Sequence, residues 1–405
     1  MTIQVFRPAS SMAVCGAGMA GLALATLLAR RGYRPVVFEA RSEEACRTEG
    51  AFVTLAPNGL SALRALGTDR RTVNAGLATH AIELCNHHGR SLGSVDWTGD
   101  GADGIVDSVT IGRGTLIGIL IDAARLAGVE LHFDWRLTAV SEAAANVTLS
   151  FEGAAEPLAF DMVAAADGLG SAVRAAVFPD LPTPRYTGLV GTGGVGFVPG
   201  VPSTGGVMRM TFGRRAYFGY QKEGNGPVYW FNSYPLAERD LAPVTDPVSY
   251  MTFLRSLHEG DPDPIPRILA AVPAMERYYP INDLPPLATW HTQRVVLLGD
   301  AAHAVAPHAG QGASMALEDA VVLAACLDDA TKPVAAFERF EFLRKARTRT
   351  VMEVARRSGA RKRANGPISI FLRDLLLPFV LPLGARQARR IASFRVDQAP
   401  LALPA

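Results

Sequence analysis

Apolar residues near the start of the chain form a short run, a glycine-rich break and a longer run. The first run, Met12 to Cys15, has the length of a buried strand. The segment 22–31 is rich in alanine and leucine, as a helix is, and a second strand is predicted from Arg34 to Phe38. The pattern predicts a strand, a tight turn, a helix and a second strand in succession.

Two later apolar runs are also bounded by turn residues. The run from Met162 ends in Asp167 and Gly168 and is followed by a helix start. The run from Arg294 leads into a loop of small residues and then a helix from about Met315 to Leu327. Both runs are predicted to be buried strands.

The segment between these runs, residues 186–235, has a different pattern. Aromatic and aliphatic residues alternate in short stretches separated by turn residues such as Gly224 and Pro227, with no helical pattern between them. We expect a mostly antiparallel sheet here, joined by a strand at about residues 78–86. Three aromatic residues that alternate on these strands either face an apolar or aromatic substrate or belong to the core of the sheet: Phe218, Tyr220 and Trp230.

The C-terminal region is predicted to be helical. Residues 333–358 form a long, basic, amphipathic helix pattern. The next apolar run, Ile368 to Leu383, is interrupted by two charged residues and two prolines, so it falls short of the roughly 18 clean residues of a membrane span. We expect a buried helical hairpin that ends near Phe394 and no transmembrane segment; contact with a membrane surface or a lipid-like substrate is the alternative.

Composition narrows the class of protein. The chain has 405 residues, of which 49% are apolar and 19% charged, so it can bury a large core. A formal net charge of +2 gives no field that would gather nucleic acid, and we expect no nucleic-acid partner. The 4 cysteines are far apart, which indicates neither a metal site nor a disulfide framework. Together with the absence of a secretory pattern in residues 1–11, this favours the cytoplasm.

The first turn carries chemistry as well as structure. Gly16, Gly18 and Gly21 have the spacing G-x-G-x-x-G, in which the glycines allow a tight turn, close approach of a pyrophosphate and close helix packing. The helix N-terminus offers free N–H groups and a partial positive charge to the phosphates. Glu39, at the end of the second strand, can accept both hydroxyls of an adenosine ribose. We therefore predict dinucleotide binding, although NAD and FAD share this first unit.

Four motifs in order resemble one family. They are the glycine-rich turn at 16–21, the Asp-Gly pair at 167, the Gly-Asp pair at 299, and the Pro-x-x-Gly-Gln-Gly loop at 307–312. Together they resemble the class A FAD-dependent monooxygenases, the para-hydroxybenzoate hydroxylase-like family with its tetracycline-inactivating and antibiotic-tailoring members. The resemblance spans most of the chain and identifies the dinucleotide as FAD.

The resemblance also implies site residues. Glu39 would hold the ribose, Arg47 and Arg113 would flank the cofactor, Asp300 would contact the ribityl chain, and the backbone of 310–313 would face the isoalloxazine. Asp167 either contacts the cofactor or only caps the following helix. Ser314 stands where many relatives have asparagine, which puts its side-chain role in doubt. The complete expected set of cofactor-binding residues is Gly16, Gly18, Ala20, Gly21, Glu39, Ala40, Arg41, Arg47, Arg113, Asp167, Asp300, Gly310, Gln311, Gly312 and Ala313.

The implied activity is oxygen insertion. In the family, NADPH or NADH binds transiently and reduces the FAD, and a flavin C4a-hydroperoxide formed with O2 hydroxylates or epoxidises a small apolar or aromatic substrate, often in secondary metabolism. No catalytic side chain is needed, so His303 and His308 are expected to be packed or solvated. A halogenase or a reductase of the same fold, or a catalytically idle flavin-binding partner protein, remains an alternative.

The expected fold is α/β. A Rossmann-like FAD-binding domain made of residues 1–75, 100–180 and 283–330 is interrupted by a mostly antiparallel substrate domain of residues 76–99 and 181–282. A tail of C-terminal helices takes up residues 331–405.

Overall fold

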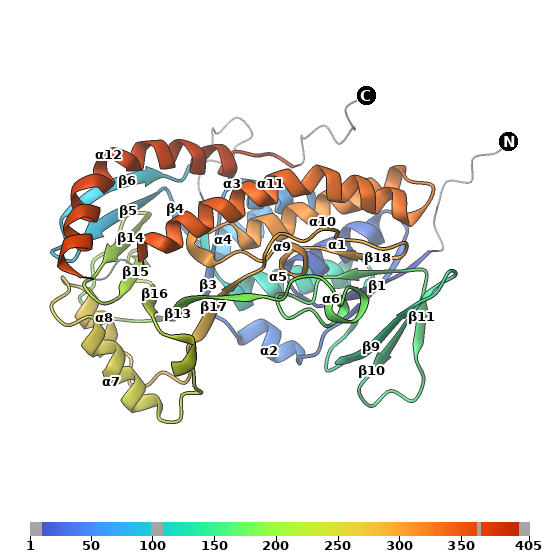
Figure 1. Ribbon diagram of the computed structural model, residues 1–405, viewed down its shortest axis with the longest axis horizontal. Helices are drawn as coiled ribbons and strands as arrows, with labels where there is room; N and C mark the ends of the chain where they lie inside the picture. The colour runs from blue at the N-terminus through green and yellow to red at the C-terminus, as the bar shows by residue number, and fades with distance from the viewer. Residues whose placement is uncertain (1–9, 99–107, 363–365, 397–405) are drawn as a thin grey trace.

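The computed structural model describes residues 10–98, 108–362 and 366–396. Figure 1 shows an elongated molecule with a sheet near each end and long helices between them. The expectations for the N-terminal residues 1–9 and for domain borders near residue 100 lie outside the described residues.

A five-stranded parallel sheet has the order β18-β12-β1-β2-β8. Its central strands are apolar and buried on both faces, as in sheets covered by helices on each side. The strands are β1 (Ser11–Cys15), β2 (Arg34–Phe38), β8 (Glu130–His132), β12 (Met162–Ala165) and β18 (Val295–Leu297). These include all four buried strands expected from the sequence.

Three long helices belong to this layer: α1 (Met19–Arg30), α5 (Arg113–Leu126) and α10 (Gly312–Asp329). Helix α1 contacts both α5 and α10, and residues 20–28 of α1 are all buried. A helix that is apolar on every side is a core helix. Its first turn is therefore held rigidly against the sheet.

Smaller elements surround the parallel sheet. One three-stranded antiparallel sheet consists of β9 (Leu137–Glu142), β10 (Val147–Phe151) and β11 (Leu158–Phe160); another consists of β3 (Phe52–Leu55), β7 (Ser108–Gly112) and β4 (Leu77–Thr79). The short helices here are α2 (Glu43–Thr48), α3 (Pro57–Ala65), α4 (Asp69–Ala75), α6 (Ala172–Val177), α9 (Asp300–His303) and η2 (Pro307–Ala309).

A seven-stranded sheet lies at the other end, with the order β17-β13-β16-β15-β14-β5-β6. All neighbours are antiparallel except β14 and β5. The strands are β5 (Ala81–Asn86), β6 (Ser91–Asp96), β13 (Arg185–Gly196), β14 (Val207–Phe212), β15 (Tyr217–Lys222), β16 (Val228–Pro235) and β17 (Tyr279–Asp283). The mostly antiparallel sheet expected from the sequence is confirmed; the exact domain borders remain a proposal.

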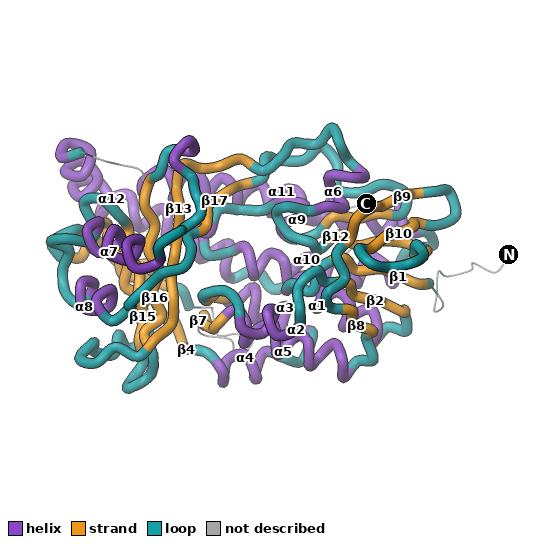
Figure 2. Tube along the Cα trace, turned by 90° about the horizontal axis from the view of Figure 1, so that it is seen from below, coloured by secondary structure: helices purple, strands orange, loops and turns teal. Residues whose placement is uncertain are grey.

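Two helices, α7 (Pro247–Leu257) and α8 (Ile265–Ala270), cover the outer face of this sheet, with the turn η1 (Glu238–Asp240) before them. Figure 2 shows them on the side that faces away from the parallel sheet. The inner face of the seven-stranded sheet is therefore turned toward the parallel sheet and its helices.

The C-terminal helices differ from the expectation. Helix α11 (Pro333–Lys362) packs on α10, and α12 (Pro367–Ala392) runs beside β6. The expected buried hairpin is wrong, because α12 is one helix that continues through Pro378 and Pro382. Both prolines are exposed, and Figure 1 shows α12 bending around the end of the seven-stranded sheet. Proline commonly bends a helix without ending it when the freed carbonyls can reach water.

Candidate active site

A cavity of about 1180 Å³ extends from the loop after β1 to helix α12. Loops that follow β1, β2, β12 and β18 line one end, and the inner face of the seven-stranded sheet with α12 lines the other. The volume exceeds the range of about 300–1,000 Å³ that is usual for one small ligand. The cavity therefore has room for two ligands.

The glycine-rich turn opens onto this cavity. A Cβ on Gly21 would lie 2.0 Å from the carbonyl oxygen of Gly16, so only glycine allows α1 to pack this closely. A Cβ on Gly18 would meet only the oxygen of Ala166, at 3.9 Å, and Gly18 lines the cavity with Gly16 and Ala20. Gly21 is thus a packing residue, and Gly18 leaves space for a ligand.

Glu39 ties the turn to the end of β2. Its Oε2 accepts a hydrogen bond from the backbone N–H of Ala17 at 2.9 Å, and its Oε1 accepts from the backbone and side chain of Arg41 at 3.1 and 3.0 Å. Glu39, Ala40 and Arg41 all line the cavity. The carboxylate lies beside the glycine-rich turn, where it can accept hydrogen bonds from the hydroxyls of a ribose.

A second helix N-terminus faces the same cavity. Helix α10 begins at Gly312, three residues earlier than expected, and Gly310, Gln311, Gly312 and Ala313 line the cavity wall. Neither α1 nor α10 has a side-chain cap, so their first-turn N–H groups are available to a ligand. Two uncapped helix N-termini therefore point positive partial charge into one space.

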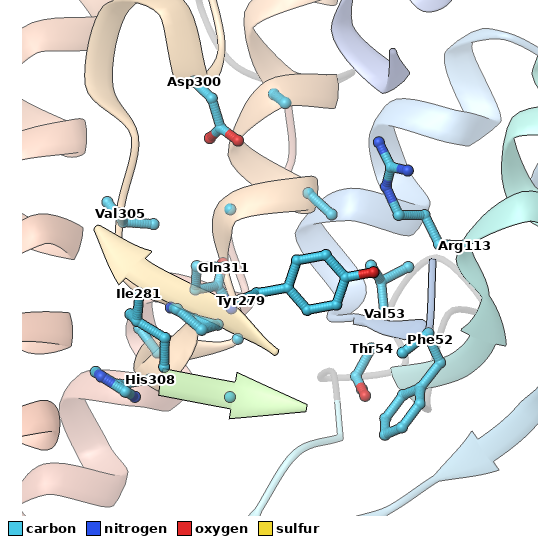
Figure 3. A pocket seen from close by; sticks show the side chains of 18 of the residues that line it. Phe52, Val53, Thr54, Arg113, Tyr279, Ile281, Asp300, Val305, His308 and Gln311 are labelled. Atoms are coloured by element: carbon cyan, nitrogen blue, oxygen red, sulfur yellow. The ribbon is translucent and has the colours of Figure 1, made fainter. Parts of the chain in front are cut away.

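Asp300 and Arg113 face each other across the cavity. Figure 3 shows the Asp300 carboxylate, at the start of α9, and the Arg113 guanidinium, at the start of α5, on opposite sides of it. Asp300 lies deep in the molecule, yet its side chain is exposed to the cavity. Burial raises the pKa of Asp300, and the charges of His303 and Arg113 oppose this rise.

Asp167 fulfils one of its two expected roles and is placed for the other. Its Oδ2 accepts a hydrogen bond from the backbone N–H of Val173, at 3.1 Å, at the start of α6. Its buried Oδ1 has no hydrogen-bond partner among the described residues, and Asp167 lines the cavity. Burial raises the pKa of this carboxyl.

Two buried acids of α10, Glu318 and Asp319, hold the cavity loops in place. Asp319 Oδ2 accepts from the backbone N–H of Gly299 at 2.8 Å and from His303 Nε2 at 2.6 Å. Although burial alone would raise it, the interactions with His303 and Arg344 lower the pKa of Asp319 to about 2. This carboxylate thus holds the backbone of Gly299 and the side chain of His303, on either side of Asp300.

Glu318 acts on the other loop through an asparagine. The amide of Asn58 donates to Glu318 Oε1 at 2.7 Å and to Gln311 Oε1 at 2.9 Å. Arg344 of α11 donates to both acids, at 2.6 Å to Glu318 and 2.7 Å to Asp319, and is itself only 1% exposed. Sequence reasoning missed this network; its only signal is the pair of acids in the middle of a mostly apolar helix.

The two histidines of the loop behave as expected of packed residues. His303 is buried, bonded to Asp319, and its ring lies 5.2 Å from that of Trp290. His308 lies on η2 at the cavity wall, with its ring against Gly359 of α11. His303 is therefore held away from the cavity by its bond to Asp319.

The expectation for Arg47 is wrong. Its guanidinium donates to Glu43 and Asp122, each at 2.8 Å, between α2 and α5. It is absent from the cavity wall. The two carboxylates, neither of them predicted from the sequence, hold the side chain on the surface of α5.

Of the two positions expected for Phe218, Tyr220 and Trp230, the one that faces the substrate is wrong. The three residues share one face of the sheet, as their alternation predicts, but it is the outer face under α7 and α8. Phe218 and Trp230 stack with their ring centroids 5.7 Å apart and are 0% and 2% exposed. They belong to the sheet core, which is the other position expected from the sequence.

The opposite residues of the same strands line the cavity. Because side chains alternate along a strand, the inner face presents Tyr217 and Phe231 instead. The apolar lining of this end consists of Ile82, Leu84, Val95, Trp97, Met208, Met210, Phe212, Tyr217, Phe231, Leu377, Val380 and Leu381. Alternation identified the two faces but could not tell which one α7 and α8 cover.

Lys362, the last residue of α11, adds a cation to this apolar end. It lines the cavity, and its Nζ lies 3.9 Å from the ring centroid of Tyr217 and 5.8 Å from that of Phe231. No carboxylate among the described residues pairs with it. Burial lowers the pKa of Lys362 to about 7.

The cavity wall fits FAD. Uncapped N-termini of α1 and α10 suit a diphosphate and the electron-rich edge of a flavin, and Glu39 and Asp300 supply oxygen acceptors for hydroxyls. The open space at Gly18 and the unpartnered Oδ1 of Asp167 are features that a bound ligand would explain. The fold and the site thus define an FAD-binding oxidoreductase with a separate apolar subsite.

Comparison with known proteins gives the family. The sequence pattern described as "FAD binding domain" matches residues 9–210 and 283–358 of the chain. The chain belongs to this family of FAD-binding proteins, and it is an FAD-dependent monooxygenase.

Individual relatives agree with this membership. The chain is 29% identical over 398 residues to aurachin C monooxygenase/isomerase of Stigmatella aurantiaca, covering 95% of each chain. It is 32% identical over 353 residues to 3-amino-4-hydroxybenzoate 2-monooxygenase of Streptomyces cremeus, covering 85% of this chain and 86% of that one. A variant of HpxO from Klebsiella pneumoniae, solved with FAD, has a TM-score of 0.82 and 25% identity, covering 95% of this chain and 99% of the other.

Replacing Asp300 tests the assigned role of its carboxylate. Asp300→Ala should weaken FAD binding by about 1.5–3 kcal/mol, roughly ten- to a hundredfold, because a hydrogen bond to a charged group is lost. Fluorescence titration of the apoprotein with FAD measures the change, with Asp328→Ala, which pairs with Arg31 outside the cavity, as the control. Unchanged FAD affinity together with lost turnover would mean that Asp300 acts on the substrate.

Proposed function

We propose that this monooxygenase uses NADPH or NADH to insert one oxygen atom from O2 into a small aromatic or apolar molecule bound between the seven-stranded sheet and α12. The products are a hydroxylated or epoxidised compound and water. We place the reaction in the cytoplasm and in secondary metabolism. The observation that supports the proposal is the apolar end of the cavity, which continues directly from the end that is lined by the glycine-rich turn, Glu39 and Asp300.

FAD, when bound, supplies the electrons and the activated oxygen. The protein then has three tasks: to bind the cofactor, to orient the substrate and to exclude water. The apolar side chains of the inner sheet face and the buried side of α12 suit the last two tasks. His303 is bonded to a carboxylate inside the core, which supports a reaction without a side-chain acid or base at that position.

The wall also favours one kind of substrate. Lys362 is placed to receive an acidic group, such as a phenolic hydroxyl or a carboxylate, on an otherwise aromatic molecule. A phenolic oxygen donates electrons to the ring, which suits attack on an electrophilic oxygen, whereas a carboxylate would serve only to bind Lys362. The Streptomyces cremeus relative is named for a substrate of this kind, a hydroxybenzoate.

The proposal is tested by NAD(P)H consumption. Holoenzyme is mixed with NADPH or NADH and a set of aromatic acids, phenols and neutral aromatic compounds without an acidic group, and NAD(P)H oxidation is followed with and without each compound. We expect stimulation by compounds that carry an acidic group, with little hydrogen peroxide released. Stimulation by no compound in the set, or only by compounds without an acidic group, would contradict the proposed substrate.

Lys362→Met tests the cation directly. We expect kcat/KM for an acidic substrate to fall about ten- to a hundredfold at pH 6, through a higher KM, because a charge-assisted hydrogen bond is lost. The pH dependence of kcat/KM reports the pKa values of groups in the free enzyme. Since Lys362 is protonated only below a pKa of about 7, the wild-type advantage should shrink as the pH rises through 7. Lys332→Met is the control, because Lys332 does not line the cavity; an equal effect in both variants, at every pH, would remove Lys362 from the site.

A further inference from the structure

Helix α12 exposes an apolar stripe along its outer side. Side chains at i, i+3, i+4 and i+7 spacings follow one face of a helix. On α12 the large apolar side chains on this side that do not line the cavity are between 47% and 76% exposed: Ile368, Phe371, Leu372, Leu375, Leu376 and Phe379. A contiguous exposed patch of this kind marks an interaction site.

The opposite side of the same helix is part of the enzyme. Leu377 and Leu381 are buried and line the cavity. Helix α12 packs on β6, where a Cβ on Gly93 would lie 2.6 Å from Leu381, so the glycine makes room for the helix. The helix is therefore docked through its inner side, and the stripe is left facing outward by the fold.

The charged residues of α12 have a definite order relative to its apolar stripe. The two charged residues within it, Arg373 and Asp374, pair with each other at 2.7 Å, and their side chains are only 8% and 17% exposed. The exposed residues Arg386, Arg389 and Arg390 come directly after Leu383; of these, Arg389 lies 3.7 Å from the exposed carboxylate of Asp96 on β6. Asp374 is the one acid in the sequence of α12, so the outward side is apolar and then positively charged.

We propose that α12 binds the surface of a bilayer that contains anionic phospholipids. The stripe enters the boundary between headgroups and acyl chains, and the arginines contact the headgroup phosphates. This combination of an apolar face and basic residues is the one that interfacial helices use. Basic residues near an anionic surface add to the attraction, as at the cytoplasmic leaflet.

The geometry favours lying on the bilayer over crossing it. By length and composition, the segment Ile368–Ala392 is the helix in the described part of the chain that passes as a membrane span. However, its inner side lines the cavity through Leu377 and Leu381, and a crossing helix would have to leave the cavity wall. The contact also brings the apolar end of the cavity close to the bilayer, from which a lipid-soluble substrate would enter.

A second copy of this chain is a poorer occupant. A twofold contact would place the same patch against itself. The arginines of one copy would then find no exposed acid on α12 of the other. The bilayer proposal supplies a negative partner for them, and it stands independently of the function proposed above.

Vesicle co-sedimentation of the full-length holoenzyme tests the proposal. The probes are vesicles of phosphatidylcholine alone and of phosphatidylcholine with phosphatidylglycerol. The stripe variant is Phe371→Ser with Phe379→Ser and Leu375→Ser, none of which lines the cavity. The matched control is Phe197→Ser with Val248→Ser and Phe342→Ser, whose wild-type side chains are 76%, 59% and 59% exposed elsewhere. FAD content and melting temperature confirm that each variant is folded.

We expect the wild type and the control to bind the anionic vesicles, and the stripe variant to bind at least about tenfold more weakly. A second variant, Arg386→Gln with Arg390→Gln, should lose most of the preference for phosphatidylglycerol, and added salt should do the same to the wild type. This charge variant keeps the test informative if the stripe variant does not fold.

Three results would overturn the proposal. The first is that the wild-type holoenzyme binds neither kind of vesicle. Binding that is seen only after residues 397–405 are removed counts as this result, because the full-length protein then does not bind. The second is that the stripe variant and the control lose binding equally. The third is that the wild type is a dimer in ultracentrifugation, that the stripe variant is a monomer, and that vesicles are bound by neither.

Discussion

Arg344→Met should lower the free energy of unfolding by about 3 kcal/mol. The substitution removes the guanidinium that bonds to both Glu318 and Asp319. Arg347 still bonds to Glu318 and His303 to Asp319, so the charge of the acids is only partly compensated. Removing one partner of a buried ion pair costs far more than the pair itself contributes, because the remaining charge stays in a poorly solvating interior. FAD affinity should fall as well, since these acids position Gly299 and, through Asn58, Gln311.

Urea unfolding of the holoenzyme, with an FAD titration of each variant, measures both effects. Arg239→Met is the control, because Arg239 pairs with Asp240 at 3.8 Å with a side chain that is 88% exposed. Exposed pairs of this kind contribute about 0–1 kcal/mol. A change below about 1 kcal/mol for Arg344→Met would contradict the account of a buried network that holds the cavity loops.

Gly18→Val should abolish most FAD binding while leaving the fold intact. The backbone at Gly18 has a φ of −81°, which any residue adopts, and its Cβ position contacts only one oxygen at 3.9 Å. The new side chain would instead occupy the space in which the pyrophosphate approaches the helix N-terminus. We expect at least about a hundredfold weaker binding, or about 2.7 kcal/mol, and a smaller loss for Gly18→Ala.

The matched control is Gly196→Val, because a Cβ at Gly196 meets nothing within 4 Å and Gly196 does not line the cavity. Gly21→Val should behave differently from both. Its side chain would collide with the backbone oxygen of Gly16, so it should destabilise the apoprotein itself. If Gly18→Val bound FAD like the wild type, the glycine-rich turn would not be the phosphate site.

Local sequence patterns predicted the cofactor side of the molecule well, because its signals are local. A strand that ends in Gly16, Gly18 and Gly21 and an acid at the end of the next strand specify one kind of unit wherever they occur. The parallel sheet and the loop at 310–313 follow from such signals. The fold class, the cofactor and the family were confirmed.

Other features depended on contacts between distant segments. Alternation placed Phe218 and Trp230 on one face of the sheet, but the position of α7 and α8 decides that this face is the core. Arg47 is held by Asp122, which is 75 residues away, and nothing near Arg47 in the sequence indicates this. Lys362 and the Glu318–Arg344 pair likewise become parts of the site only when α11 packs on α10.

Helix α12 shows that proline within an apolar run does not always end a helix. Pro378 and Pro382 were expected to divide the apolar run into a hairpin. Four residues apart in a helix, they lie on the same exposed side, so the helix bends and continues. The apolar side chains of this run were expected to be buried in a hairpin, but many of them lie on the surface of one continuous helix.

Incorporation of isotope-labelled O2 tests the central claim most directly. Holoenzyme, NADPH and the aromatic acid or phenol that most stimulates NADPH oxidation are incubated under labelled O2, and the products are analysed by mass spectrometry, with Gly18→Val as the parallel sample. We predict a product that carries one labelled oxygen atom in the wild type and is absent with the variant. NADPH oxidation with all of the label recovered as hydrogen peroxide or water, and an unchanged organic compound, would contradict the account.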